Sequence, residues 1–383
     1  MIARYKPNEM DTGMISEITT YVRLSLDAWY GPGSTLESDI PEIRSYRNSF
    51  MLRYPIVTSG AQPKHILVKI RRTPKMESLH EAVHADIHQN VPSEYESLEF
   101  VYEGLGRRKE NFGALRPLAF IEKYFAIVME EYPSRTLRQL LNRQRSSRAE
   151  QPLCELKDAA RKTGRWLYYF HHHMHIPSEQ PYTTADVLKE VQDYAERIQF
   201  YSRGRVQAQQ ILQAFSEKLA GIPIHQVAFS QSHADMTCDN VLYSDDKKVC
   251  VIDIKTRLAP IYADLGLILI HPDTFRSQIF SGGRYYPESL LRAYRSEIIA
   301  GYFEEAPGNE VLARLYSAIK TLDKWLMYEE LMNRYKGLKR ILAIPAAPFV
   351  SAYFHNLMKK YLDLIDAAAD RDTQLANTVD SAL

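Results

Sequence analysis

The feature that most constrains the fold is a hairpin pattern inside residues 230–266. Two short apolar runs, 240–243 and 249–252, flank a polar segment, 244–248, that is rich in Asp and Lys. Apolar runs of this length around such a segment predict two antiparallel strands joined by a turn. The residues just before the first strand and just after the second are therefore expected to meet.

Acidic and amide side chains lie at this open end of the hairpin. Asp235 and Asn240 belong to the loop that enters the first strand, and Asp253 leaves the second. We expect the turn to fold Asp253 back beside the other two. A carboxylate and an amide near a second carboxylate supply the hard oxygen ligands of Mg²⁺. Asp235 is then left to orient an attacking hydroxyl, because phosphoryl transfer depends on positioning and charge neutralisation.

The order and spacing of these residues resemble a known superfamily. A His-x-Asp-x4-Asn pattern begins at His233, and Asp253 follows the asparagine by 13 residues. Residues 259–266 are similar to a "P-x-x-D-L-A" segment downstream. Together these motifs resemble the aminoglycoside phosphotransferase and choline kinase superfamily. The resemblance spans roughly residues 40–270, and the helices beyond it match only in kind.

The resemblance implies a bilobal, protein-kinase-like α+β fold that uses ATP and Mg²⁺. Residues 1–130 are expected to form a small β-rich lobe with a helical extension. Residues 131–383 are expected to form a larger, mostly helical lobe that carries the catalytic loop and the acceptor pocket. Residues 184–220 are expected to contribute to that pocket.

By the same resemblance, Asp235 is the catalytic base or the residue that orients the acceptor hydroxyl. Asn240 and Asp253 are the expected Mg²⁺ ligands, and His233 is expected to be structural. Asp264 matches the aspartate that orients the catalytic loop in the superfamily. Alternatively, it caps the helix that follows.

A lysine in an apolar strand is the candidate phosphate ligand. Lys69 lies among β-branched neighbours in residues 65–70, where a lysine needs an acceptor. The resemblance assigns it to the α and β phosphates and pairs it with Glu94, or with Glu96 if the helix register differs. A solvent-facing lysine is the alternative. Ser93 is the expected N-cap of the helix that carries the glutamates.

Two further parts of the nucleotide site are assigned by resemblance. The phosphate-covering turn is expected at Asn48 and Ser49, although no glycine lies there to ease close approach to a phosphate. Residues 31–33 are a rival position because they contain two glycines. Backbone groups of Glu130 and Tyr132 are expected to contact adenine at the hinge.

Histidine clusters offer an alternative, metal-binding interpretation. His80, His84 and His88 have the spacing of one helical face, for which a solvated face is favoured over a metal site. A second cluster, residues 171–175, ends an amphipathic helix predicted over 154–173. His171 is expected to be structural, because the superfamily commonly ends this helix in Leu-His.

Two positions depart from the superfamily pattern. Ala234 replaces the usual glycine between the histidine and the aspartate, which is tolerable if its φ is negative. Lys255 lies two residues after Asp253 and either neutralises phosphate or repels Mg²⁺. Because neither departure removes an oxygen ligand, we expect an active enzyme.

Composition excludes several other classes. Of the 383 residues, 45% are apolar and 25% charged, which is typical of globular proteins, and the net charge of +1 gives no case for nucleic acid. Three cysteines without metal-ligand spacing indicate a reducing compartment, which we expect to be the cytoplasm. No signal peptide is expected, and residues 341–354 are too short and proline-broken to span a membrane. The basic residues 336–340 leave open a contact with an anionic membrane surface, although solvated core helices are favoured.

The favoured function is a small-molecule kinase that phosphorylates an alcohol hydroxyl, most simply of a sugar or sugar derivative. Choline/ethanolamine-type and aminoglycoside kinases are alternatives, and a nucleotide-binding pseudokinase or regulatory protein is another. A protein kinase is disfavoured, because no Ala-Pro-Glu segment is recognisable and little chain separates Asp253 from residues 263–265. The acceptor, the choice of ATP over GTP and the oligomeric state stay open.

Overall fold

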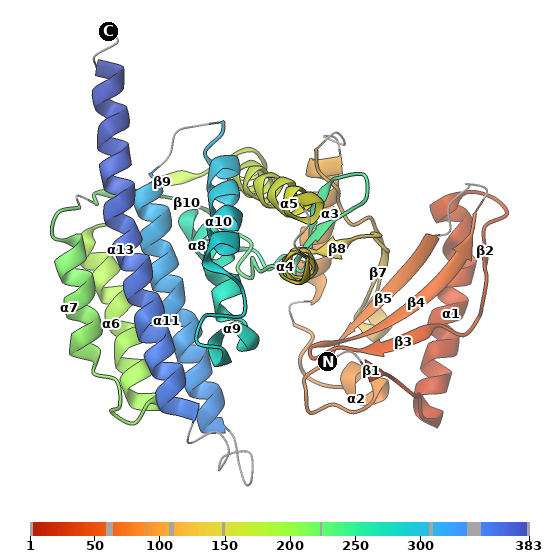
Figure 1. Ribbon diagram of the computed structural model, residues 1–383. Helices are drawn as coiled ribbons and strands as arrows, with labels where there is room; N and C mark the ends of the chain where they lie inside the picture. Colours follow the sequence, from red (N-terminus) through yellow and green to blue (C-terminus); the bar gives the residue numbers. More distant parts are fainter. Residues whose placement is uncertain are drawn as a thin grey trace. The chain divides into compact units, whose positions relative to one another are not determined.

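Figure 1 shows the computed structural model of the chain. The structure describes residues 3–58, 64–89, 91–106, 111–147, 150–222, 224–305, 309–334 and 346–380. The chain divides into two compact units. The first unit contains Met1–Ser134, Ser244–Asp246 and Cys250–Ile254, and the second contains Arg135–Tyr243, Lys247–Val249 and Lys255–Leu383.

The first unit is built on an antiparallel sheet in which the strand order is β1-β3-β4-β5-β7-β6, with β2 paired to β4. The strands are β1 (Ala3–Arg4), β2 (Thr35–Leu36), β3 (Glu42–Ser45), β4 (Ser49–Val57), β5 (Lys64–Arg71), β6 (Pro117–Ile121) and β7 (Ala126–Glu130). The apolar strand predicted at residues 65–70 is confirmed as β5.

Alternation along β5 decides which way Lys69 faces. Ile66, Val68 and Ile70 are fully buried and join a core with helix α1 (Glu9–Tyr30) and the short helix α2 (Leu79–Val83). Because successive side chains of a strand point to opposite faces, Lys69 faces away from that core. Helix α3 (Val91–Gly106) contacts β6 and β7 of the same sheet.

The second unit is mostly helical (Figure 1). Its helices are α4 (Leu137–Ser146), α5 (Glu150–Tyr169), α6 (Thr184–Tyr201), α7 (Ala208–Leu219), α8 (Tyr262–Ile270), α9 (Arg276–Phe280), α10 (Glu288–Tyr302), α11 (Glu310–Arg334) and α13 (Ala346–Asp380). Two small sheets complete the topology, with strand orders β13-β10-β9 and β12-β11-β8, and most of β12 belongs to the first unit. Their strands are β8 (Arg135–Thr136), β9 (Ser178–Pro181), β10 (Gln226–Ser232), β11 (Val241–Tyr243), β12 (Val249–Val251) and β13 (Arg257–Pro260). The hairpin predicted from residues 240–252 is confirmed as β11 and β12.

Helix α8 is the buried centre of the second unit, and every one of its residues is buried. Gly266 lies against α11, where a Cβ atom would come within 2.6 Å of the Tyr316 carbonyl carbon. A larger residue would therefore force the two helices apart. This close packing fixes α8, and with it Asp264 in its first turn.

Two local predictions in the first unit are wrong. Helix α2 ends at Val83, so His88 does not continue a helical face; it is buried, stacks on Phe125 with ring centres 4.5 Å apart, and its Nε2 lies 2.7 Å from the Ala82 carbonyl oxygen. Ser93 is not an N-cap, because α3 already begins at Val91. A proline follows at position 92, where the first turn of a helix tolerates it.

None of the helices in the described part of the chain combines the length and apolar character that crossing a bilayer requires. The basic segment 336–340 and the first part of the apolar run 341–354 lie outside the described residues. The three cysteines are free, with Cys238 and Cys250 buried and Cys154 exposed.

Candidate active site

The predicted phosphate ligand Lys69 lies in a network of charges within the first unit. Its Nζ donates to Glu94 Oε1 at 2.7 Å and also contacts the Asp253 carboxylate. Arg71 approaches the second Glu94 oxygen at 2.8 Å. Burial alone lowers the pKa of the Lys69 ammonium, but Asp253 and Glu94 outweigh it and raise that pKa above its usual value. Lys69 is therefore a fixed cation, only 13% exposed.

Local structure explains why Glu94, and not Glu96, meets the lysine. Lys69 lies opposite Met51 of β4 and Ile127 of β7. In α3, Glu94 faces Lys69, whereas Glu96 is exposed. Residues two apart in a helix do not share a face, so only one of the two glutamates can reach the sheet.

The expected phosphate-covering turn is the tight connection between β3 and β4. Tyr46 N–H donates to the Ser49 carbonyl at 2.8 Å, and Arg72 N–H donates to the Asn48 carbonyl at 3.0 Å. The Arg72 guanidinium lies 4.6 Å from the centre of the Phe50 ring. The turn is therefore held by backbone and cation–π contacts instead of by glycine.

The rival glycine segment lies at the other end of β4. Gly31 and Gly33 follow α1 with positive φ angles of 92° and 81°, and they lead into β2, which pairs with Ile56 and Val57. Lys69, by contrast, pairs with Met51, near the Ser49 end of β4. Of the two candidates, the turn that contains Asn48 and Ser49 is the nearer to Lys69 along the sheet.

The predicted hinge residues lie at the end of β7 and just after it. Glu130 N–H donates to the Arg116 carbonyl at 2.9 Å, and the Glu130 carboxylate pairs with Lys64 at 2.9 Å. The Tyr132 hydroxyl donates to Ser244 Oγ at 3.0 Å, and burial raises the pKa of Tyr132 to about 12. These contacts fix the segment after β7 while leaving its adenine contacts a prediction.

In the second unit, the loop of His233 and Asp235 is held by the buried carboxylate of Asp264. Its Oδ2 accepts the His233 N–H at 2.5 Å, and its Oδ1 accepts the Ala234 N–H at 3.1 Å. His171 Nε2 donates to Oδ2 at 3.2 Å. The helix cap considered from the sequence is absent, since Ile261 occupies the N-cap of α8.

The electrostatics of Asp264 follow from these donors. Asp264 is 2% exposed, and burial by itself raises the pKa of its carboxyl. The hydrogen bond from His171, the charges of the His171 and His233 rings, and the His233 N–H outweigh burial and lower that pKa to about 2. A buried carboxylate is tolerated only when such donors replace water.

The condition for tolerating alanine at position 234, a negative φ, is not met, because the φ of Ala234 is +65°. The left-handed conformation turns the His233 and Ala234 N–H groups toward the same carboxylate. The superfamily's usual glycine would adopt this conformation without a steric penalty. Alanine adopts the same conformation with steric strain, and the hydrogen bonds to Asp264 offset that strain.

Asp235 and Asn240 lie together in this unit. Asn240 Nδ2 donates to the Asp235 backbone carbonyl oxygen at 2.9 Å. The side-chain amide nitrogen is thus engaged, and the amide oxygen is the atom of Asn240 that can bind a cation. Lys255 Nζ lies 2.9 Å from Asp235 Oδ2, and Lys255 N–H donates to the His233 carbonyl at 3.1 Å. Asp253 belongs to the other unit, so its expected place beside these residues stays a prediction.

The His171 contact depends on a feature that sequence periodicity missed. Helix α5 gives way to a π-helical stretch, Phe170–Met174, which widens the last turn. Burial, then His171 and His173, lower the pKa of His172 to about 4. Among the described residues, no group of three or more His, Cys, Asp or Glu is arranged to hold a metal ion. The cluster is therefore packed against aromatic rings, as in the stacking of His172 on Tyr168.

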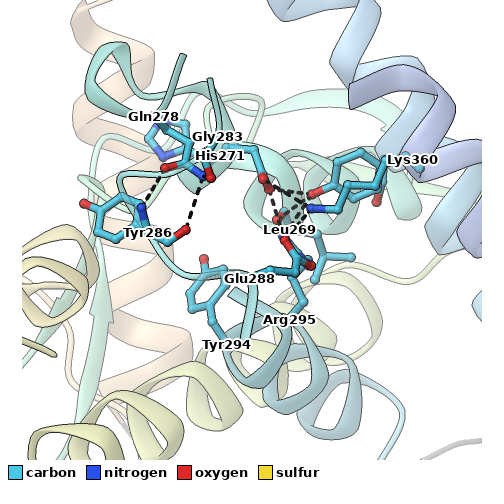
Figure 2. Close-up of polar contacts among 12 residues, drawn as sticks. Leu269, His271, Gln278, Gly283, Tyr286, Glu288, Tyr294, Arg295 and Lys360 are labelled. Atoms are coloured by element: carbon cyan, nitrogen blue, oxygen red, sulfur yellow. Dashed lines mark hydrogen bonds and ion pairs between the residues drawn. The ribbon is translucent and has the colours of Figure 1, made fainter. Parts of the chain in front are cut away.

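A 3-10 turn after α8, His271–Thr274, connects the loop to a second polar network (Figure 2). His271 Nδ1 accepts the Cys238 N–H at 3.0 Å, and burial, with Lys324 and Arg138 nearby, lowers the pKa of His271 to about 3. The ring is therefore neutral and able to accept. The other end of the turn carries Asp273, which is buried.

Asp273 is paired within this network, which sequence analysis did not predict. Arg295 Nη1 donates to Asp273 Oδ2 at 2.8 Å, and its Nη2 contacts Glu288, which Lys360 also pairs with at 2.7 Å (Figure 2). The charges come from distant parts of the chain, so no local motif could have revealed them. Asp273, Glu288 and Lys360 border a cavity of about 280 Å³. Its lining is Asp273, Gln278, Gly282, Gly283, Glu288, Phe349, Ala352, Tyr353, Asn356, Leu357 and Lys360.

Comparison with solved structures identifies the fold. The chain is similar to a glucosamine kinase, with 12% identity and a TM-score of 0.52 over 91% of this chain and 82% of that one. It is similar to a choline kinase from Cryptosporidium parvum Iowa II, with 14% identity and a TM-score of 0.51 over 93% and 97%. It is also similar to a putative aminoglycoside phosphotransferase from Ralstonia eutropha JMP134, with 12% identity and a TM-score of 0.53 over 90% of this chain and 97% of that one.

These similarities confirm the predicted bilobal kinase-like α+β fold and, at the level of fold, the resemblance to the aminoglycoside phosphotransferase and choline kinase superfamily. No family model and no curated protein matches the sequence. The identities are too low to carry activity or substrate from one chain to another.

Ala234→Gly should stabilise the protein by about 1 kcal/mol. Glycine removes the steric strain of the left-handed conformation, and this gain exceeds the loss caused by the greater freedom of glycine in the unfolded chain. Urea unfolding monitored by circular dichroism measures this. Ala220→Gly is the matched control, since Ala220 has a φ of −57° and should lose stability on the same change. An equal loss in both variants would contradict the strained-turn interpretation.

The Asp264 carboxylate should make stability acid-sensitive. Because folding lowers its pKa from 3.8 to about 2, the ionised group stabilises the fold above pH ~4 by about 2 kcal/mol, and this is lost as the pH falls through about 2. The stability difference between the parent and Asp264→Asn should therefore shrink between pH 6 and pH 2.5 in urea titrations. Asp193→Asn, on the exposed face of α6, is the control, and a constant difference for Asp264→Asn would refute the assignment.

Proposed function

We propose that the protein is an ATP- and Mg²⁺-dependent small-molecule kinase that transfers the γ-phosphoryl group to an alcohol hydroxyl. The observation that carries the proposal is the contact of Lys69 with both Glu94 and Asp253. A buried lysine fixed by a helix glutamate is suited to hold nucleotide phosphates, because its charge is permanent and its position set. The kinase-like fold supports the same conclusion.

The proposed roles follow the sequence. Lys69 binds the α and β phosphates and Glu94 positions it, while the turn of Asn48 and Ser49 covers the phosphates. Backbone groups of Glu130 and Tyr132 contact adenine. These assignments rest on the resemblance and on the contacts within the first unit.

Asp235 is the proposed base in the second unit. The acceptor oxygen forms a bond to the γ-phosphorus as the bond to the β,γ-bridging oxygen breaks, and ADP leaves with that electron pair. Asp235 orients the hydroxyl and takes its proton. Asp264 is a positioning residue, because it holds the backbone of His233 and Ala234.

The donor set fits Mg²⁺. The amide nitrogen of Asn240 is engaged, so its oxygen is the atom available to a cation, and Asp253 supplies a carboxylate that is 41% exposed. Mg²⁺ in nucleotide sites is commonly held by one or two protein oxygens, with water and phosphate completing the shell. When bound, the ion would neutralise phosphate charge.

A neutral, polyhydroxyl acceptor such as a sugar or sugar derivative is favoured over a cationic one. Asp273 and Glu288, the carboxylates beside the 3-10 turn, are paired with Arg295 and Lys360, so this part of the second unit presents no excess of acid. A choline- or aminoglycoside-type acceptor calls for acidic groups in excess. The free cysteines support a reducing, cytoplasmic setting.

The second candidate is a nucleotide-binding pseudokinase. The Lys255–Asp235 ion pair favours it, since it occupies the proposed base. A glycine-free phosphate turn also favours it. Both candidates bind nucleotide, so only turnover separates them.

Mg²⁺-dependent ADP release from ATP, measured across sugars, amino alcohols and aminoglycosides, tests the proposal. Acceptor-stimulated turnover is expected with at least one hydroxyl compound. Asp235→Asn should reduce it by about 10²-fold or more, because general-base assistance is lost, and Asp253→Ala should abolish it. Lys359→Met, a change at an exposed lysine of α13, is the control, and its turnover should match that of the parent.

Nucleotide binding without turnover, unchanged in Asp253→Ala, would favour the pseudokinase. Absence of any nucleotide binding would contradict both candidates.

A further inference from the structure

Lys255 is held against the proposed base at two points. Its Nζ lies 2.9 Å from Asp235 Oδ2, and its backbone N–H donates to the His233 carbonyl, two residues before that base. The backbone hydrogen bond fixes the Cα atom of Lys255 beside the loop that carries Asp235. All of these residues belong to the second unit, so the arrangement is independent of how the units are placed.

Simple chemistry brings the reacting phosphoryl group close to this ammonium. A hydroxyl oriented by Asp235 lies within hydrogen-bond distance of its carboxylate, and in-line attack requires the phosphorus about 3–3.5 Å from the hydroxyl oxygen. The oxygens of the transferred phosphoryl group are then within reach of the Lys255 side chain, whose backbone is bonded to the same loop. Those oxygens carry the charge that a cation stabilises in transfer.

Lys255 is also able to change partner. Its side chain is 50% exposed and that of Asp235 is 36% exposed, and ion pairs between exposed groups are weak. Lys69, in contrast, is 13% exposed and is engaged by both Glu94 and Asp253. Lys255 therefore has the mobility that a ligand of the transferred phosphoryl group needs, whereas Lys69 has the rigidity of a ground-state ligand.

We propose that Lys255 is a further catalytic residue, which pairs with Asp235 when no nucleotide is bound and moves to the γ-phosphate of a bound nucleoside triphosphate. This inference rests on the proposed function. As Lys255 leaves, Asp235 becomes available to the acceptor hydroxyl and takes its proton, while the phosphoryl group moves to the acceptor oxygen and ADP departs with the bridging oxygen. Lys255 keeps its own proton throughout and contributes charge alone.

The exchange predicts a specific pattern of affinities. Lys255 contacts the γ-phosphate and not the β-phosphate, so it should strengthen binding of the β,γ-imido analogue of ATP over binding of ADP. Lys255→Met should shrink the ratio of the two dissociation constants about tenfold, and Asp235→Asn, which loosens the ion pair, should enlarge it. Isothermal titration calorimetry with Mg²⁺ measures both ratios without turnover.

Turnover supplies the second readout. Lys255→Met should lower kcat about 10²-fold, with little change in KM for the acceptor, because the contact is strongest in transfer. Lys255→Arg should restore part of kcat, since it keeps the charge. Lys359→Met, at an exposed lysine of α13, is the matched control for loss of an exposed lysine, and it should leave kcat and both affinities as in the parent.

The outcomes separate the two claims. An unchanged affinity ratio in Lys255→Met overturns the inference, even if the parent is an active kinase. If the parent turns over no acceptor, the proposed function and the catalytic role of Lys255 both fail, and the ratio then decides only whether Lys255 binds the γ-phosphate. Loss of all nucleotide binding in the parent overturns both. Circular dichroism checks folding, and Lys255→Gln replaces the methionine variant if that variant misfolds.

Discussion

The geometry of the candidate catalytic loop depends on one buried carboxylate. Asp264 lies in α8, the fully buried helix of the second unit, and accepts hydrogen bonds from the backbone of His233 and Ala234 and from the ring of His171. A charge at this depth is tolerable only because three donors replace its lost water. The same donors hold the loop in the shape that places Asp235 and Asn240 together.

The first unit uses the same principle with the opposite charge. Lys69 is a buried cation whose desolvation is offset by two carboxylates, Glu94 and Asp253. In the first unit the carboxylates fix the Lys69 ammonium on β5. In the second unit the Asp264 carboxylate on α8 fixes the loop that carries Asp235. Lys255 differs, because it is exposed and its partner is the proposed base itself.

Much of this was predictable from local signals. The turn-flanked apolar runs gave β11 and β12, and the apolar strand around Lys69 with the following glutamate gave their ion pair. These patterns depend on neighbours in sequence, which is why they were readable. The positive φ of Ala234 could not be predicted in this way. Its strain is offset by a hydrogen bond to the Asp264 carboxylate, which lies 30 residues away in the sequence.

The network of Asp273, Arg295, Glu288 and Lys360 was equally invisible, since its members meet only after the helices pack. His88 shows the converse error. A spacing of four favoured a helical face, but burial against Phe125 ended the pattern, so tertiary packing overrode local periodicity.

The most direct test of the central claim is whether phosphorus itself moves to a hydroxyl. ³¹P nuclear magnetic resonance of ATP, Mg²⁺ and a stimulating acceptor would follow the fate of the γ-phosphate. The account predicts a phosphate monoester signal, coupled to acceptor protons, that grows in proportion to ADP and is lost with Asp235→Asn. Inorganic phosphate as the sole new signal would contradict it, because ATP would then be hydrolysed without transfer.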